Sequence, residues 1–221
     1  MKNFLTAVIP IRKGSQRVKG KNFKPFAKKN LLIHKIEILK KINNLDRIVV
    51  NTDSEEAISI ARDMNVDHQR REDYYASSKC PNSEFWSHIG KTTDSKYIMF
   101  TNCTSPLIKY ETYVNFINNF KKNIDEYDSF NTVTKIKEFL YLDNKPLNFD
   151  IKKTPNSQDL PDVVKFNFAI NILECKKMYE NMSLIGKKPF LYNLDEVEGF
   201  DINYPLEFDF AEYLFNNKHK S

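Results

Sequence analysis

Short apolar segments alternate with helix-forming segments along the first 65 residues. Residues 4–11 (FLTAVIPI) and 46–53 (DRIVVNTD) are short, apolar and rich in β-branched residues, which is typical of strands buried in a parallel sheet. Residues 31–42 carry apolar side chains at helical spacing, and residues 54–65 open with a serine and two glutamates, a favourable helix N-terminus. This order predicts an α/β fold built on a doubly wound, mostly parallel sheet.

The rest of the chain contains the same kinds of segment. Its apolar and amphipathic runs predict strands at residues 96–102, 129–137, 165–173 and 190–195, and helices at residues 82–92, 112–122 and 205–215. Residues 66–81 are less regular, and we assign no element to them. A chain of 221 residues can bury one sizeable core, so we expect residues 1–221 to form a single domain with Trp86 and the phenylalanines in that core.

Residues 138–165 differ in composition from the segments around them. They contain three prolines and many turn-forming residues, together with Phe139, Tyr141 and Phe149. A plain surface loop would leave these large apolar side chains exposed to water. We therefore expect residues 138–165 to leave the main sheet as a hairpin or arm that contacts a partner subunit.

The loop after the first strand is basic and contains small residues. It carries a cluster of cations, Arg12, Lys13, Arg17, Lys19, Lys21 and Lys24, and beside them Gly14, Ser15 and Gly20. A glycine-containing cationic loop at the end of a buried strand suits a polyphosphate, because backbone N–H groups and side-chain cations point at anionic oxygens. From composition alone, an ordinary solvated loop is an equally good interpretation.

Polar residues follow several of the predicted strands. In a doubly wound sheet, ligands bind outside the carboxyl ends of the strands, so these residues should face one crevice. Asp53, Asp201 and Asn203 could supply oxygen ligands for Mg²⁺, which takes one or two carboxylates together with substrate phosphates. Phosphoryl or nucleotidyl transfer needs this kind of site. Asp53 is better explained as a neighbour of a helix cap, and we leave it out of the candidate site.

Composition and missing motifs exclude several other classes. A net charge of +5 does not require a nucleic-acid partner. The sequence lacks GxxxxGK[ST], GxGxxG and GxSxG, which argues against a P-loop NTPase, a dinucleotide oxidoreductase and an α/β-hydrolase. Three scattered cysteines without a CxxC pair favour a reducing cytoplasm. No run resembles a signal peptide or a membrane span, so we expect a cytoplasmic protein without a membrane partner.

Six segments, in order along nearly the whole chain, resemble the family of CMP-acylneuraminate synthetases (acylneuraminate cytidylyltransferases). The basic loop IPIRKGSQRVKGKN is similar to the family pattern IPARxGSKxxxxKN. The other five segments are DRIVVNTDSEEAISIARDMNV, RREDYYASS, FTNCTSPL, NSQDLPDVVKFNFAINIL and FDINYPLEFDFAEYL. A single segment such as TSPL is too short to identify a family, but six such segments in the right order are specific to it.

This resemblance implies a Mg²⁺-dependent enzyme that transfers CMP from CTP to an acidic sugar, a nonulosonate such as a sialic-acid-like sugar, and releases pyrophosphate. It implies nucleotide binding by Arg12, Gly14, Ser15, Lys21, Asn22 and Arg71, with Arg71 preferred over Arg70. It implies acceptor binding by Asn102, Ser105, Gln158 and Asn167. Metal binding falls to Asp201 and Asn203, and catalysis to Arg12, Lys21 and Asp201. The resemblance also implies a homodimer whose arms reach the partner's site, and a role in cell-surface polysaccharide biosynthesis.

The chain departs from the family pattern at several positions. A lysine is replaced by Gln16, a glutamine by Asn102, an arginine by Ile108, a glycine by Phe168 and a metal-binding aspartate by Asn203. Most of these changes fall on the acceptor side, so a different anionic acceptor remains open: an octulosonate, or a small molecule bearing a phosphate or phosphonate. A non-catalytic homologue that binds nucleotide or RNA is the remaining alternative.

Overall fold

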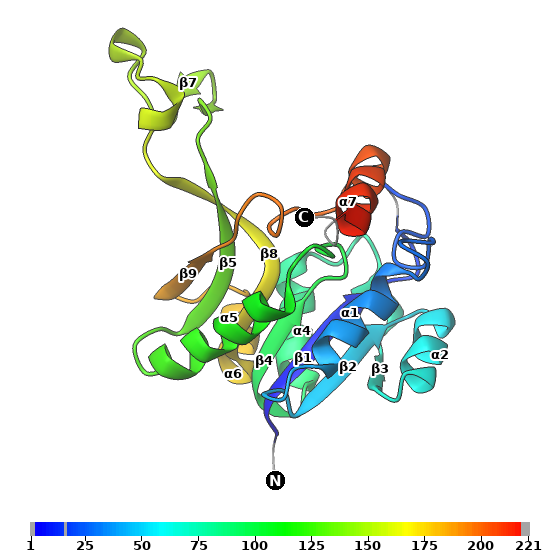
Figure 1. Cartoon of the computed structure of the whole chain (residues 1–221). Helices are drawn as coiled ribbons and strands as arrows, with labels where there is room; N and C mark the ends of the chain where they lie inside the picture. The colour runs from blue at the N-terminus through cyan, green and yellow to red at the C-terminus, as the bar shows by residue number, and fades with distance from the viewer. Residues whose placement is uncertain (1–2, 16, 218–221) are drawn as a thin grey trace.

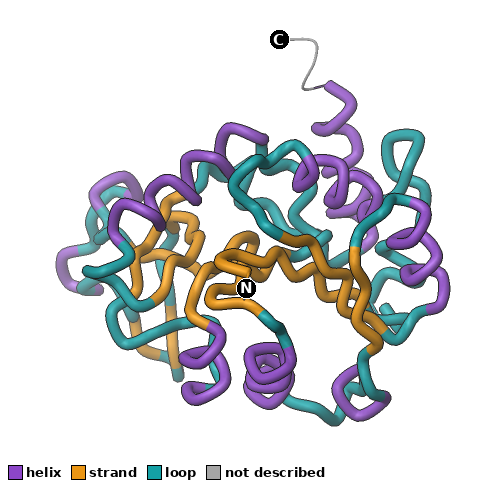
Figure 2. The backbone as a smooth tube through the Cα atoms, turned by 90° about the horizontal axis from the view of Figure 1, so that it is seen from below, coloured by secondary structure: helices purple, strands orange, loops and turns teal. Residues whose placement is uncertain are grey.

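The computed structural model describes residues 3–15 and 17–217, so Gln16 lies outside the described residues. The described residues form a seven-stranded sheet in the order β3-β2-β1-β4-β8-β5-β9. Helices cover both of its faces (Figures 1 and 2). The strands are β1 (Asn3–Ile11), β2 (Arg47–Thr52), β3 (Asp67–Arg70), β4 (Ser95–Thr101), β5 (Ser129–Ile136), β8 (Val163–Glu174) and β9 (Pro189–Asn193).

Parallel pairing joins β1 to β2 and β4, β2 to β3, and β5 to β9. Strand β8 runs antiparallel to both of its neighbours, β4 and β5. The predicted doubly wound, mostly parallel sheet is therefore confirmed. Because β8 runs the other way, its first residues lie at the edge where the parallel strands end.

Two apolar cores lie on opposite faces of the sheet. Side chains alternate along β1, so Leu5, Ala7 and Ile9 enter one core while Val8 enters the other. The larger core is covered by α1 (Leu31–Lys40), α2 (Glu55–Asp63), α5 (Tyr110–Asn123) and α7 (Pro205–Asn217). The smaller core is covered by α4 (Asn82–Thr92) and α6 (Cys175–Asn181). No helix among the described residues is long and apolar enough to cross a membrane.

Residues 66–81 contain elements that the sequence did not predict. They form the edge strand β3 and the short helix α3 (Asp73–Ala76). The β3 sequence, DHQR, has no apolar residue, and its side chains are largely exposed. Hydrophobic periodicity cannot detect such a strand. Helix α6 was not predicted either, because it has only seven residues and buries only Cys175 and Met178, too few to show a helical period.

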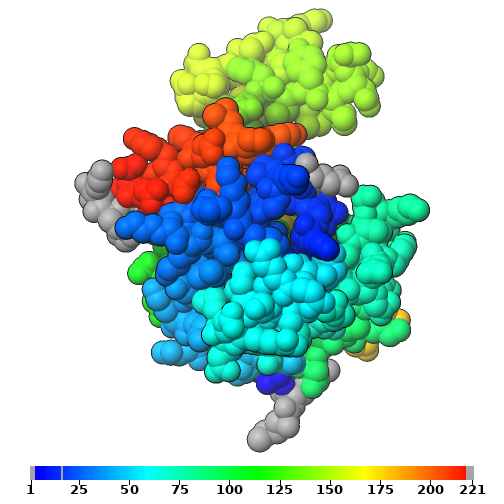
Figure 3. Space-filling model, turned by 90° about the vertical axis from the view of Figure 1, so that its right-hand side faces the viewer, coloured from blue at the N-terminus to red at the C-terminus, as the bar shows by residue number. Residues whose placement is uncertain are grey.

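The predicted excursion lies between β5 and β8. There the chain leaves the sheet and forms the hairpin β6 (Tyr141–Leu142) and β7 (Lys145–Pro146), followed by two short 3₁₀ turns, Ile151–Lys153 and Ser157–Asp159. This arm projects well away from the sheet (Figures 1 and 3). Asn148 braces its base, since Oδ1 accepts a hydrogen bond from Leu140 N (2.9 Å) and Nδ2 donates one to Glu138 O (2.9 Å).

The arm does not bury all of its apolar side chains within this chain. Phe149 packs against Phe139 and Tyr141, with ring centroids 4.9 and 5.6 Å away. Even so, Phe139 stays 43% exposed, Tyr141 58% and Leu142 61%. The arm therefore presents an apolar surface to solvent.

Candidate active site

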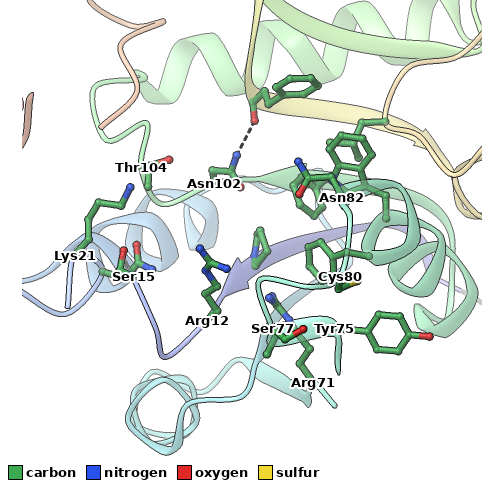
Figure 4. Close-up of a pocket in the computed structure, with 18 of the residues that line it drawn as sticks. Arg12, Ser15, Lys21, Arg71, Tyr75, Ser77, Cys80, Asn82, Asn102 and Thr104 are labelled. Carbon is green, nitrogen blue, oxygen red and sulfur yellow. Dashed lines mark hydrogen bonds between the residues drawn. The ribbon is translucent and has the colours of Figure 1, made fainter. Parts of the chain in front are cut away.

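A cleft of about 490 Å³ opens at the sheet edge where β1, β2 and β4 end. Figure 4 shows its wall, and Figure 3 shows the hollow beside the first loop, drawn in dark blue. The loop after β1 supplies the cations Arg12, Arg17 and Lys21 to the cleft. The segment after β3 supplies Arg71, Tyr75, Ala76, Ser77 and Cys80, and the segment after β4 supplies Asn102 and Thr104. Its position is the one expected for a ligand site in a doubly wound sheet, and its volume suits a small molecule.

The first loop is held in place by contacts at both of its ends. Lys13 N donates a hydrogen bond to Asp53 Oδ1 (2.8 Å), which fixes the loop to the residue that follows β2. Gly20 adopts a left-handed backbone (φ +63°), which favours glycine. The Gly20 carbonyl then accepts hydrogen bonds from Phe23 N and Lys24 N. Asp53 therefore braces the loop and is not part of the cleft wall.

Lys21 connects the first loop to the segment before α7. Its side chain is buried, and Nζ donates a hydrogen bond to Ile202 O (2.5 Å). Burial lowers the pKa of Lys21, while the negative charge of Asp201 opposes that shift. Lys21 therefore lines the cleft, and its ammonium group interacts with the charge of Asp201 without forming an ion pair with it.

Asp201 precedes Ile202, the residue whose carbonyl Lys21 contacts, and does not itself line the cleft. Its Oδ2 accepts a hydrogen bond from Asn203 Nδ2 (2.8 Å), whereas Oδ1 is buried and has no hydrogen-bond partner among the described residues. Burial raises the pKa of Asp201, and the Thr104 hydroxyl, the Asn203 amide and the charge of Lys21 oppose the shift. A buried carboxylate oxygen without a partner needs an explanation. A hard cation such as Mg²⁺ fits it, because Mg²⁺ binds through one or two carboxylates and substrate oxygens.

The segment that carries Asp201 is fixed by backbone hydrogen bonds. Ile202 N donates to Thr104 O (2.9 Å), and Glu207 accepts from the backbone N–H groups of Asn203 (2.5 Å) and Tyr204 (2.9 Å). Asn203 directs its amide nitrogen towards Asp201, so in this arrangement it orients the carboxylate. No group of three or more His, Cys, Asp or Glu side chains suited to a metal occurs in the described part of the chain.

Arg71 forms the floor of the cleft on the β2 side. It is 5% exposed, and it donates hydrogen bonds from Nε to Asn51 Oδ1 (2.7 Å) and from NH2 to Asn51 O (2.8 Å). Its guanidinium carbon lies 4.2 Å from the centroid of the Phe85 ring, a cation–π arrangement. Burial lowers the pKa of Arg71 to about 10, so it remains charged at neutral pH. Arg70 points away into an exposed ion pair with Glu55.

The structure places half of the predicted site residues in the cleft wall. These are Arg12, Ser15, Lys21, Asn22, Arg71 and Asn102 (Figure 4). The other half lies outside it: Gly14, Ser105, Gln158, Asn167, Asp201 and Asn203.

Three predicted acceptor-binding residues are among those outside. Ser105 is buried, and its carbonyl accepts a hydrogen bond from Lys35 Nζ (3.2 Å). Asn167 is held in β8 by hydrogen bonds to β5. Gln158 is exposed on the arm.

Several cleft residues were not predicted from the sequence. They are Tyr75, Ser77, Cys80, Asn82, Phe85, Trp86, Thr104 and Leu184; Phe168, expected on the acceptor side as the replacement of a glycine, also lines the cleft. Trp86, expected in the core, packs against the smaller core but is only partly buried, and it also lines the cleft. Apolar side chains at helical spacing show that one face of α4 is covered, but they do not show whether the cover is core or ligand. Ile108, which replaces a cation, is buried in the larger core.

Comparisons with known proteins identify cytidylyltransferases as similar to this chain. Residues 6–162 match the model of a family described as cytidylyltransferase. The chain is 24% identical over 230 residues to the N-acylneuraminate cytidylyltransferase of Escherichia coli O18:K1:H7. That match covers 100% of this chain and 54% of the relative, so the chain spans about half of that relative's length. It is 25% identical over 236 residues to a pseudaminic acid cytidylyltransferase of Campylobacter jejuni, covering 100% of this chain and 99% of the relative.

Solved structures resemble this fold at low sequence identity. A CMP:2-keto-3-deoxy-manno-octonic acid synthetase complexed with CTP matches with a TM-score of 0.73 and 12% identity, over 98% of this chain and 100% of that one. A 4-diphosphocytidyl-2C-methyl-D-erythritol synthase from Anaerococcus prevotii matches with a TM-score of 0.68 and 14% identity, over 97% of this chain and 96% of that one. At these identities, the likeness concerns the fold.

Proposed function

Because this chain belongs to the cytidylyltransferase family, we propose that it transfers CMP from CTP to an acidic sugar of the nonulosonate type and releases pyrophosphate. The observation that carries the proposal is the meeting of Arg12, Lys21 and Arg71 around one cleft, with the open carboxylate oxygen of Asp201 behind it. Relatives named for transfer to N-acylneuraminate and to pseudaminic acid support an acidic sugar as the acceptor.

In this reaction, a hydroxyl oxygen of the acceptor forms a bond to the α-phosphorus of CTP. The bond from that phosphorus to the oxygen bridging to the β-phosphate breaks, pyrophosphate leaves, and the hydroxyl proton passes to solvent. The protein forms no covalent bond in this reaction, so it acts by positioning the reactants and neutralising charge on the phosphates. Arg12 and Lys21, with Ser15 and the loop backbone at Gly14, would hold the triphosphate.

Arg71 and Asn22 would hold the cytidine. Arg71 is fixed by Asn51 and Phe85 before any ligand arrives, so little rotamer freedom is lost on binding. Asp201 would hold Mg²⁺ through its open Oδ1, and the bound ion would neutralise charge on the phosphates. Asn203 would keep Asp201 turned towards the cleft, and Lys21 would add positive charge beside the leaving group.

We further propose that two chains form a homodimer through their arms, with Gln158 of one chain reaching the acceptor in the other. The exposed apolar surface of the arm supports this, because large exposed apolar patches mark interaction sites. A cytoplasmic location, where CTP is available, agrees with the free cysteines Cys80, Cys103 and Cys175.

Light scattering coupled to size-exclusion chromatography tests the dimer. The double variant Tyr141→Ser/Leu142→Ser is expected to elute as a monomer. The control Tyr179→Ser, which removes an exposed aromatic ring from α6 at the other end of the molecule, is expected to leave the dimer intact (Figure 1). A wild-type monomer, or a dimer that survives the double substitution, would overturn this part of the proposal.

Pyrophosphate release tests the activity. The chain is mixed with CTP, Mg²⁺ and a panel of acidic sugars and phosphorylated small molecules, and Asp201→Ala is assayed in parallel. We expect release with a nonulosonate, none with ATP or UTP, and loss of activity in the variant. Release only with a phosphorylated acceptor would replace the acceptor class. Binding of CTP without release on any acceptor would favour a non-catalytic nucleotide binder.

A further inference from the structure

The cleft is chemically divided into a cationic side and an apolar side. Its cations, Arg12, Arg17, Lys21 and Arg71, come from the first loop and from the segment after β3. The apolar side is formed by Phe85, Trp86, Phe100, Phe168 and Leu184, which we call the aromatic wall. Its rings contact one another in two pairs, Phe85 with Phe100 (6.3 Å between centroids) and Trp86 with Phe168 (5.9 Å).

Phe168 reaches the cleft because β8 is interrupted by a bulge. The pairing of β5 with β8 passes from Asn131↔Asn171 to Val133↔Phe166, so four residues of β8 lie opposite Thr132 alone. Ile170 N donates to Thr132 Oγ1 (3.0 Å). A bulge of this kind re-aims a side chain, and bulges are common beside active sites.

Asn167 stabilises the bulge. Its Oδ1 accepts a hydrogen bond from Thr132 Oγ1 (2.6 Å), and its Nδ2 donates one to Thr134 Oγ1 (3.0 Å). The Phe168 carbonyl in turn accepts a hydrogen bond from Asn102 Nδ2 (3.2 Å), drawn as a dashed line in Figure 4. Asn167, predicted to bind the acceptor directly, therefore positions Phe168.

Phe168 adopts a left-handed backbone conformation (φ +52°). This region is unfavourable for a bulky side chain and is natural for glycine. A strained residue persists only where the surrounding contacts enforce it, and such residues cluster at binding sites. A phenylalanine at this position therefore points to a role for the ring itself.

We propose that Phe168 and Trp86 determine acceptor specificity by receiving an apolar substituent of the acidic sugar, such as an acyl or a deoxy methyl group. This inference rests on the proposed cytidylyl transfer. A carboxylate or phosphate does not suit the wall, because ring faces carry partial negative charge and a buried anion needs a partner. The anionic group of the acceptor therefore faces the cationic side, and its apolar substituent faces the wall.

Three acceptor sugars test whether the enzyme recognises an apolar substituent. N-acetylneuraminate and pseudaminic acid carry acyl groups, whereas 2-keto-3-deoxy-manno-octonic acid carries neither an acyl nor a methyl group. When two substrates differ by one small apolar group that fits a pocket, the substrate that carries the group has a kcat/KM that is roughly 10- to 200-fold higher. We expect the wild type to favour the acylated sugars over the octonic acid by at least about 10-fold.

Substitution of Phe168 tests the ring directly. Phe168→Gly removes the ring and relieves the left-handed strain, while Phe168→Ala removes the ring and keeps the strain. Both are expected to reduce the preference for acylated sugars about 10-fold and to leave the KM for CTP within about twofold. Phe166→Ala is the matched control, because Phe166 contacts Phe168 (5.8 Å between centroids) but does not line the cleft. Thermal melting checks that each variant folds.

Fluorescence gives a second measurement, because Trp86 is the single tryptophan of the chain. An acylated sugar is expected to change this fluorescence more than the octonic acid does at equal saturation. Equal turnover of all three sugars, or a preference that both Phe168 variants retain, overturns the inference and leaves the proposed function standing. If the wild type releases no pyrophosphate with any acceptor, both the specificity inference and the proposed function are overturned.

Discussion

Lys21 donates a hydrogen bond from Nζ to the backbone carbonyl of Ile202 (2.5 Å), joining residues 181 positions apart in the sequence. The contact fixes the first loop to the segment that carries Asp201. A cation from one end of the chain and a carboxylate from the other are thereby held at the same cleft. The candidate site is therefore complete only when nearly the whole chain has folded.

Lys21→Met is expected to lower the rate of pyrophosphate release at least 100-fold, the usual effect of removing one preorganised donor at a site where charge develops. The melting temperature should change little, because the loss of the hydrogen bond to Ile202 is offset by removal of a charge that burial disfavours, as the lowered pKa of Lys21 indicates. The control Lys19→Met removes an exposed neighbour and should stay within about twofold of wild type. Near-normal release by Lys21→Met would remove Lys21 from the phosphate site.

Asp201→Asn is expected to abolish activity and to raise the melting temperature at neutral pH without Mg²⁺. The pKa of Asp201 is raised in the folded chain, so its ionised form costs stability above that pKa. The cost vanishes as the pH falls, and the two melting temperatures should converge below about pH 4, near the unfolded pKa of aspartate. Mg²⁺ with CTP should stabilise only the wild type. Equal stabilisation of both proteins by Mg²⁺ and CTP would show that Asp201 does not hold the ion.

Arg71→Gln is expected to raise the KM for CTP by about 10-fold or more and to lower the melting temperature. The change leaves Asn51 without its buried partner and removes the cation over Phe85, and lost hydrogen bonds to charged groups cost about 1.5–3 kcal/mol each. Arg70→Gln is the matched control, because Arg70 forms an exposed ion pair worth little. The assay is CTP saturation kinetics beside thermal melting, and equal effects at both positions would contradict the assignment.

Gly14→Ala separates folding from phosphate binding. A Cβ at Gly14 meets no atom within 4 Å, and its backbone is not left-handed, so the variant should fold with an unchanged or slightly higher melting temperature. The KM for CTP should rise, because the methyl group occupies space next to the proposed triphosphate. Gly90→Ala offers the contrast: its Cβ would lie 2.7 Å from Cys175 O and from Tyr179 N, so stability should fall by about 1–3 kcal/mol. An unchanged KM in Gly14→Ala would mean that the loop backbone does not approach the phosphates.

The sheet and most of its helices could be predicted from sequence because their burial is periodic. The apolar runs of β1, β2 and β4 and the spaced apolar residues of α5 are direct consequences of packing against one or two covered faces. β3 could not be predicted, since an exposed edge strand with the sequence DHQR carries no such pattern. The cationic side of the cleft could be predicted because its basic loop directly follows a predicted strand, and ligands bind at the carboxyl ends of such strands.

The replacement of a glycine by Phe168 indicated a change on the acceptor side, but the aromatic wall as a whole could not be predicted from the sequence. Phe168 faces the cleft because of a bulge in β8, and the register of that bulge depends on Thr132 and Thr134 in another strand. Trp86 has the same helical spacing whether its face meets core or ligand. Pairing between distant strands, not local pattern, decides which of these side chains a ligand meets.

The reversed direction of β8 has a consequence for how this chain tolerates insertions. Because β5 ends and β8 begins at the same edge, the intervening segment starts and finishes at that edge of the sheet. Its length can change without shifting the register of any strand, and each doubling of a flexible loop adds only about 0.6 kcal/mol of closure entropy. Residues can therefore be gained or lost in this segment at small energetic cost to the sheet that carries the site.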